Sequence, residues 1–144
     1  MDGISESAAA AARDIRVVFS RLRRRLKGVD TGAGLTPSQT AVLTRLWKDG
    51  SSSTSALAAA EQVRPQSMAA IVTALDQHGL IRRAPDPDDG RRQVISLTAA
   101  GRRRAESDRE ARGEWLARAM QERYSERERR VINDALSLLQ RLTD

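Results

Sequence analysis

The chain contains no cysteine and only one histidine, His78. The absence of thiols excludes disulfide bonds, thiol-based redox sensing and zinc sites built on cysteine. A single histidine cannot form a metal site alone, and His78 lies near the end of a predicted helix, where its imidazolium would interact favourably with the helix dipole. We therefore expect neither a metal ion nor a cofactor.

Aromatic residues and long apolar runs are also scarce. The aromatic side chains are Phe19, Trp47, Trp115 and Tyr124, so alanine and leucine must form most of the core. No apolar run is long enough to span a bilayer, and residues 1–12 show no signal-peptide pattern. No segment combines a broad Phe/Trp/Leu face with lysines, as membrane-surface helices do. These absences predict a cytoplasmic protein without a membrane partner.

Enzyme signatures are missing as well. The sequence contains no G-x-S-x-G, no P-loop, no H-E-x-x-H and no thiol nucleophile. The run from Asp86 to Gly90 is similar to the start of an EF-hand calcium loop, but that pattern requires a glutamate at its twelfth position, which is Leu97 here. We therefore expect no catalytic residues and no enzymatic activity.

Basic residues, by contrast, are abundant. The 144 residues include 25 lysines and arginines against 19 acidic residues, and the formal net charge is +6. This balance predicts attraction to polyanions without defining the fold. The length corresponds to one domain, or to a small domain with helical extensions.

The segment from residue 64 to residue 98 carries the strongest pattern. Pro65 suits the first turn of a helix, where its missing N–H costs nothing, and Gly79 suits the left-handed position after the helix end. Between them, apolar residues lie at helical spacing: Met68, Ile71, Val72 and Leu75. Residues 80–83 and 93–97 then predict two strands, joined by a loop rich in proline and aspartate. A helix followed by a hairpin with a basic tip is typical of a winged helix-turn-helix, so duplex DNA is the expected partner.

The same segment contains a family signature. Asp89-Gly90-Arg91, then five residues, then Leu97-Thr98 forms the pattern D-x-R-x5-L-T. Other stretches have the same family's spacing: Leu35 to Gln39 (L-x-P-S-Q), the Leu57-Ala58 pair and the run from Gly79 to Arg82. On these residues the chain resembles, along its whole length, the MarR family of dimeric winged-helix regulators of transcription.

The predicted fold is mainly α with a small β-hairpin wing, an α+β winged helix-turn-helix with N- and C-terminal dimerisation helices. Residues 1–34 would contribute the N-terminal helix of the dimerisation region, 35–98 the DNA-binding domain, and 99–144 the C-terminal helices of the dimerisation region. The other helices are predicted at these positions: about 8–27, 37–48, 54–62, 99–123 and from 125 onward. Thr36 with Gln39, and Ser125 with Glu128, form capping boxes.

The helix-turn-helix corner departs from the common pattern. Gln62 stands near the place where such corners often carry glycine, which predicts a slightly strained or differently shaped turn. In the preceding helix we expect Leu57 and Ala60 to be buried. Residues 49–53 form a turn that can include one short strand of the wing sheet.

The C-terminal part predicts a second subunit. Residues 102–112 have almost no apolar stripe, which is typical of a solvent-bridging helix that holds two bodies apart. The last helix, in contrast, has a broad apolar face: Val131, Ile132, Ala135, Leu136, Leu138, Leu139 and Leu142. Together with the stripe from Ile15 to Leu26, this face exceeds what one subunit can bury, so we predict a homodimer.

The helical period defines which residues of the recognition helix would face DNA. If its apolar residues face the core, the opposite side presents Gln66, Ser67, Ala69, Ala70 and Thr73, next to Arg64 and Pro65 at the start. Gln66 can bond an adenine edge, whereas the alanines can only contact a thymine methyl. This composition predicts few direct base contacts and more reliance on groove shape.

In the wing, the resemblance implies that Arg91 enters the minor groove while Asp89 holds the loop or orients that arginine. Arg92 lies beside them, and a narrow A·T-rich minor groove attracts such arginines. Further phosphate contacts are predicted at Ser38, Arg82 and Arg83, with Arg64 as another candidate. Ordinary solvated surface residues are the alternative interpretation of these positions.

The functional prediction is a sequence-specific transcriptional regulator, a repressor that binds an inverted-repeat operator. The resemblance implies that a small aromatic, acidic or phenolic ligand can bind between the dimerisation helices and the winged domain. Phe19, Trp47 and Trp115 are candidates for lining that pocket, with a role in the core as the alternative. The competing prediction is an architectural DNA-binding protein with low sequence specificity, which the two alanines on the DNA-facing side favour.

Overall fold

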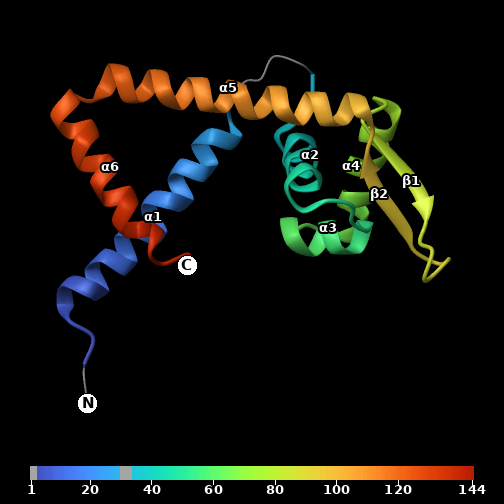
Figure 1. Cartoon of the computed structure of the whole chain (residues 1–144). Helices are drawn as coiled ribbons and strands as arrows, with labels where there is room; N and C mark the ends of the chain where they lie inside the picture. Colours follow the sequence, from blue (N-terminus) through green and yellow to red (C-terminus); the bar gives the residue numbers. More distant parts are fainter. Residues whose placement is uncertain (1–2, 30–33) are drawn as a thin grey trace.

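A computed structural model describes residues 3–29 and 34–144 of the chain. The elements, in order, are α1 (Glu6–Lys27), α2 (Pro37–Asp49), α3 (Thr54–Glu61), α4 (Pro65–Gln77), β1 (Ile81–Pro85), β2 (Gln93–Leu97), α5 (Ala99–Arg123) and α6 (Glu126–Gln140). Figure 1 shows that one half of α5 lies over α2, α3, α4 and the hairpin, which together we call the head. The other half of α5 forms an open arrangement with α1 and α6, which we call the arm.

Both predicted capping boxes are present. The Thr36 hydroxyl accepts a hydrogen bond from the Gln39 backbone at 3.2 Å, and the Gln39 side chain accepts one from the Thr36 backbone at 3.1 Å. Ser125 and Glu128 form the same reciprocal pair at the start of α6. These bonds satisfy backbone N–H groups that have no partner within the first helical turn. The starts of α2 and α6 therefore follow directly from local sequence.

The corner between α3 and α4 adopts the unusual shape predicted for it. Gln62 has φ 56° and ψ 42°, the left-handed conformation, and its backbone N–H contacts the carbonyl groups of Ala58 and Ala59. Since side chains disfavour this conformation by about 1–2 kcal/mol, the glutamine occupies a position at which glycine would be relaxed.

The prediction that Ala60 is buried was wrong: Ala60 is exposed, and Ala58 is buried beside Leu57 instead. The face of α3 with Leu57 and Ala58 is the one turned toward the core.

The wing begins where α4 ends. Gly79 has a φ of +70°, which ends the helix as predicted, and the hydroxyl of Thr98 donates to the Gly79 carbonyl at 2.7 Å. The two strands pair antiparallel, from Ile81 opposite Leu97 to Pro85 opposite Gln93. The predicted third strand is reduced to a single bridge between Ser52 and Ile95. The hairpin is therefore anchored at its root by backbone hydrogen bonds.

One apolar core holds the head together. Its buried members come from every element of the head and from α5: Val42, Leu43, Leu46, Leu57, Ala58, Met68, Val72, Leu75, Ile81, Ile95 and Ala105. Ile71, predicted to face the core, is only partly buried and packs against this cluster. The position of Ile95 and Ile81 in the cluster shows that the root of the wing belongs to the same core.

The first half of α5 differs from its prediction. Residues 102–112 do belong to a helix that connects two bodies, but this half does not stand free. Gly101, Ala105 and Asp108 are buried against the head, and a Cβ atom added to Gly101 would overlap the carbonyl oxygen of Leu80. Because glycine and alanine are small, the helix approaches the head closely without an apolar stripe of large side chains.

The arm is built differently. None of the residues of α1 and α6, all of which the structure describes, is buried. Several large apolar side chains are exposed instead: Val17, Val18, Phe19, Val131, Leu136, Leu138 and Leu142. Among the described residues, no helix has the length and apolar character needed to cross a membrane.

Candidate nucleic-acid interface

The outward side of α4 carries the residues predicted to face DNA. Met68, Val72 and Leu75 are fully or almost fully buried, which fixes the rotation of the helix. The exposed residues on the other side are Gln66, Ser67, Ala69, Ala70 and Thr73. The predicted division of the helix into a core side and a free side is therefore what the structure has, and contacts to DNA by these residues remain a prediction.

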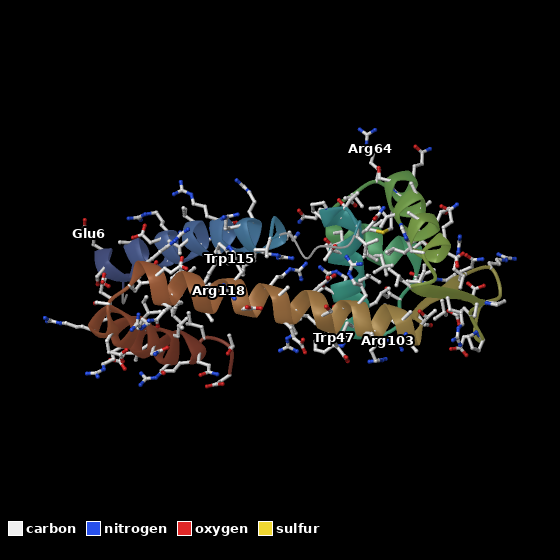
Figure 2. The ribbon with its side chains drawn as sticks, turned by 90° about the horizontal axis from the view of Figure 1, so that it is seen from above. Glu6, Trp47, Arg64, Arg103, Trp115 and Arg118 are labelled. Atoms are coloured by element: carbon white, nitrogen blue, oxygen red, sulfur yellow. The ribbon has the colours of Figure 1, made fainter. Side chains whose placement is uncertain are left out.

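The start of α4 adds a basic residue to this side. Arg64 is the residue before the helix and makes no side-chain capping hydrogen bond, while Pro65 occupies the first helical turn. Arg64 is exposed and projects from the head into solvent (Figure 2). Ser38, in the first turn of α2, is also exposed. Both residues are thus accessible to a phosphate backbone.

The tip of the wing is held by short-range hydrogen bonds to aspartates. The Asp89 carboxylate accepts the backbone N–H of Arg91 at 3.1 Å, and the Asp86 carboxylate accepts that of Asp88 at 2.9 Å. The side chain of Arg91 is exposed, and no hydrogen bond or ion pair joins it to another residue in the described part of the chain. Asp89 therefore shapes the loop, as the resemblance implied, and leaves the Arg91 guanidinium free to meet an anion.

The other arginines of the wing are not equivalent to Arg91. Arg92 donates from Nη2 to the Ser53 hydroxyl at 3.0 Å. Arg83 donates from Nη2 and Nε to Asp76 Oδ2 at 2.9 Å and 3.1 Å. Arg82 is exposed on β1. Arg83 and Arg92, predicted as DNA contacts, thus already have partners within the head, and Asp76 and Ser53 are positions that sequence analysis did not single out.

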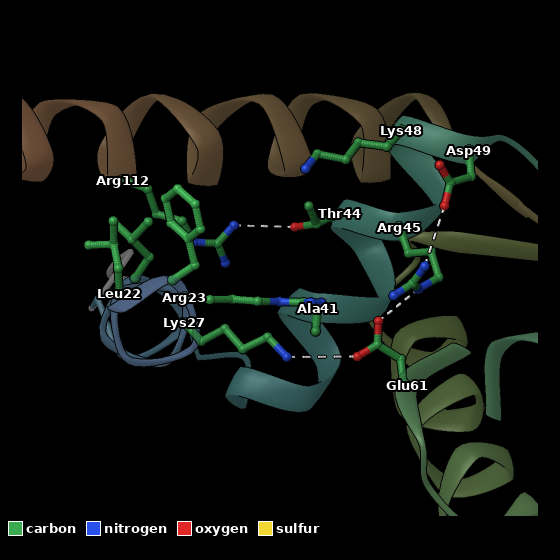
Figure 3. A pocket seen from close by; sticks show the side chains of 12 residues that line it. Leu22, Arg23, Lys27, Ala41, Thr44, Arg45, Lys48, Asp49, Glu61 and Arg112 are labelled. Atoms are coloured by element: carbon green, nitrogen blue, oxygen red, sulfur yellow. Dashed lines mark hydrogen bonds and ion pairs between the residues drawn. The ribbon is translucent and has the colours of Figure 1, made fainter. Parts of the chain in front are cut away.

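A cavity of about 700 Å³ lies between head and arm, lined by α1, α2, α5 and the end of α3 (Figure 3). Its charged lining is mostly basic: Arg23, Lys27, Arg45, Lys48 and Arg112, with Asp49 and Glu61. Glu61 accepts from Arg45 at 2.8 Å and lies 4.0 Å from the Lys27 amine. Arg112 donates to the Thr44 hydroxyl at 3.3 Å, while its Nε is buried without a hydrogen-bond partner.

The three aromatic residues predicted for a ligand pocket are not brought together. Phe19 lines this cavity, whereas Trp47 and Trp115 do not. The Trp47 ring lies 4.8 Å from the Arg109 guanidinium, and the Trp115 ring lies 4.9 Å from that of Arg25. Each tryptophan is thereby engaged in joining α5 to a neighbouring helix. In the part of the chain described, no cluster of histidine and acidic side chains is arranged to hold a metal ion.

Comparisons with known proteins agree with this geometry. The model of the MarR family matches residues 35–92. An HTH-type transcriptional regulator of Mycobacterium tuberculosis is 34% identical over 139 residues, which cover 96% of both chains. A crystal structure of a transcriptional regulator protein from Pseudomonas aeruginosa is 33% identical, covers 97% of both chains and has a TM-score of 0.79. A mutant of MarR from E. coli, 19% identical, covers 96% of this chain and 98% of its own with a TM-score of 0.74, and shares the fold.

The fold, the exposed side of α4, the exposed Arg91 of the wing and the sequence similarity all support one assignment. The chain belongs to the MarR family of winged helix-turn-helix proteins, DNA-binding regulators of transcription.

Proposed function

We propose that this protein is a cytoplasmic, sequence-specific repressor that acts as a homodimer on an inverted-repeat operator. The observation that carries the proposal is the combination of an outward-facing Gln66 with the unpartnered Arg91 at the wing tip. Gln66 would bond an adenine edge in the major groove, and Arg91 would enter the adjacent minor groove. Since Ala69 and Ala70 cannot bond base edges, much of the remaining specificity would come from groove shape.

The exposed apolar residues of α1 and α6 support the homodimer. Val131 is 62% exposed, Leu138 is 56% exposed and Phe19 is 45% exposed. Apolar surface of this extent on the two terminal helices is typical of a protein interface. A two-fold axis through the arm would present two recognition helices to successive major grooves, with half-sites about 10 base pairs apart.

A small organic anion is the proposed modulator, with the cavity between head and arm as its site. Aromatic carboxylates and phenols fit the proposal, because Phe19 and Leu22 supply apolar surface and Arg112 has a buried Nε without a hydrogen-bond partner. The cavity contacts both head and arm, so a ligand that favours one arrangement of the two would shift the population of DNA-binding dimers.

Selection of bound sequences from a random DNA library, followed by competition with unrelated duplex, tests the DNA-binding part. A regulator should prefer its selected site by about 10³-fold or more, and Gln66→Ala should lower the preference at one base pair of each half-site by about 1–3 kcal/mol. Nearly equal affinity for both duplexes would instead support the architectural protein that the two alanines of α4 favour.

Titration calorimetry with aromatic carboxylates measures whether such anions bind and how tightly. The test variant is Arg112→Gln, and the control is Arg118→Gln, a change at an exposed residue of α5. We expect binding to weaken in the first variant only. Binding of these anions that is unchanged by Arg112→Gln would contradict the proposed site.

A further inference from the structure

We propose that Asp76 and Arg83 are positioning residues that fix the wing against the recognition helix, and that Arg83 serves DNA binding through this ion pair rather than as a phosphate contact. Asp76 lies in the last turn of α4, and Arg83 is the central residue of β1. Two nitrogens of the guanidinium bond the same carboxylate oxygen, at 2.9 Å and 3.1 Å. The proposal rests on the wing contact of Arg91 proposed above.

The pair lies where β1 leaves the apolar core, although Ile95, the cross-strand partner of Arg83 in β2, is still fully buried. Ile81 is 2% exposed and belongs to the core, but the next four residues of β1 are exposed. Because side chains alternate along a strand, Arg83 follows Ile81 on the same face, one step closer to the tip. A two-stranded hairpin is at best marginally stable by itself, and the ion pair extends the attachment of β1 to α4 by two residues beyond Ile81.

The other strand is attached in a corresponding way. The backbone of Ser52 bridges Ile95, and Arg92, just before β2, bonds the Ser53 hydroxyl at 3.0 Å. The hairpin is therefore fixed to α4 through β1 and to the start of α3 through β2. Arg91 lies within the turn that the Arg92 N–H closes on the Asp89 carbonyl at 3.0 Å, and both attachments place it relative to the exposed side of α4.

Arg83 could act as a phosphate contact or as a positioning residue, and the two roles predict opposite effects of removing the Asp76 carboxylate. Loss of a negative charge favours binding to polyanionic DNA, and it would also release Arg83 if that arginine were a phosphate contact. Asp76→Asn should then bind DNA equally well or more tightly. If the pair positions the wing, Asp76→Asn should weaken binding, by about threefold to fivefold for a partly exposed ion pair.

The experiment measures the affinity of the full chain for a fluorescent duplex that carries the sequence it enriches from a random library. Four proteins form a cycle: the natural chain, Asp76→Asn, Arg91→Ala, and both changes together. We expect Arg91→Ala to weaken binding by about tenfold. In that background Asp76→Asn should add less than about twofold, because the residue acts through the position of Arg91.

Two further variants complete the test. Exchange of the charges, Asp76→Arg with Arg83→Asp, should restore affinity to within about twofold of the natural chain. Glu114→Gln removes a charge from the exposed Glu114–Arg118 pair of α5, 2.7 Å long, and should leave DNA binding unchanged. Thermal unfolding of each variant establishes that the binding assay reports folded protein.

Different outcomes contradict different statements. If Arg91→Ala does not change affinity, the proposed wing contact is wrong and the role of the ion pair falls with it. If Arg91→Ala weakens binding while Asp76→Asn strengthens it, leaves it unchanged, or adds its full effect in the double variant, only the positioning role is overturned. Failure of the folded charge-exchange variant to recover affinity overturns it as well.

Discussion

Head and arm differ in where they place their apolar residues. All members of the buried apolar cluster lie between Val42 and Ala105, in the head and the part of α5 that crosses it. The arm has comparable apolar residues, among them Leu136 and Leu138, yet these are about half exposed. Burial of apolar surface is the main driving force of folding. The head therefore completes its core within one chain, whereas the arm leaves an apolar face uncovered, the face that the proposed homodimer would bury.

The largest effect is expected when a charge is placed on the exposed apolar face of the arm. Leu138→Asp should weaken dimerisation by about 3 kcal/mol or more, because a two-fold interface loses the leucine twice. Sedimentation velocity over a concentration series measures the effect, and operator affinity should fall with it. Ala117→Asp, at an exposed position of α5, serves as the control. A Leu138→Asp dimer as stable as the natural one would contradict the proposed interface.

The contact between α5 and the head can be tested next. Gly101→Ala should destabilise the protein by about 1–3 kcal/mol, because its Cβ would overlap backbone atoms of Leu80. Gly113→Ala, in the same helix but with no atom within 4 Å of the added Cβ, should instead stabilise it by about 0.5–1 kcal/mol. Chemical denaturation measures both. Equal effects of the two substitutions would show that α5 does not depend on close approach to the head.

Within the head, one substitution is expected to stabilise the fold. Gln62 has a positive φ, so Gln62→Gly should relieve backbone strain and raise the free energy of unfolding by about 1 kcal/mol. Gln62→Ala shortens the side chain without relieving the strain and should give no such gain. Urea denaturation followed by circular dichroism distinguishes them, and a larger gain from alanine than from glycine would refute the explanation.

The smallest expected effect concerns pH at the start of α6. Hydrogen bonds from the backbone and side chain of Ser125 hold the pKa of Glu128 below its usual value of 4.5. A depressed pKa stabilises the folded state above the unfolded pKa, and this contribution disappears as the pH falls through the folded pKa. Glu128→Gln should therefore lower the melting temperature slightly at neutral pH, and this difference should shrink as the pH falls through the folded pKa. Glu122→Gln in α5 is the control, and a pH-independent difference would contradict the linkage.

Much of the site could be predicted because its determinants are local. The capping boxes and the left-handed Gly79 each depend on residues only a few positions apart, and the helical period alone turned Gln66 outward. The role of Asp89 in the wing loop, in contrast, was implied by the family resemblance. The ion pair of Asp76 with Arg83 and the bond of Arg92 to Ser53 were not predicted. The spacing of charged and polar residues in the sequence does not predict which of them will form contacts after the hairpin has folded against α4.

The sequence by itself determined the helices, their caps, the wing and the side of α4 that remains free, because hydrogen bonds and apolar periodicity act over one or two turns. Tertiary structure alone decided that Phe19 faces the cavity while Trp47 and Trp115 do not, and that Gly101 brings α5 onto the head. The physical reason is distance along the chain. Thr44 and Arg112 bond across 68 positions, and only the packing of whole helices brings such residues together.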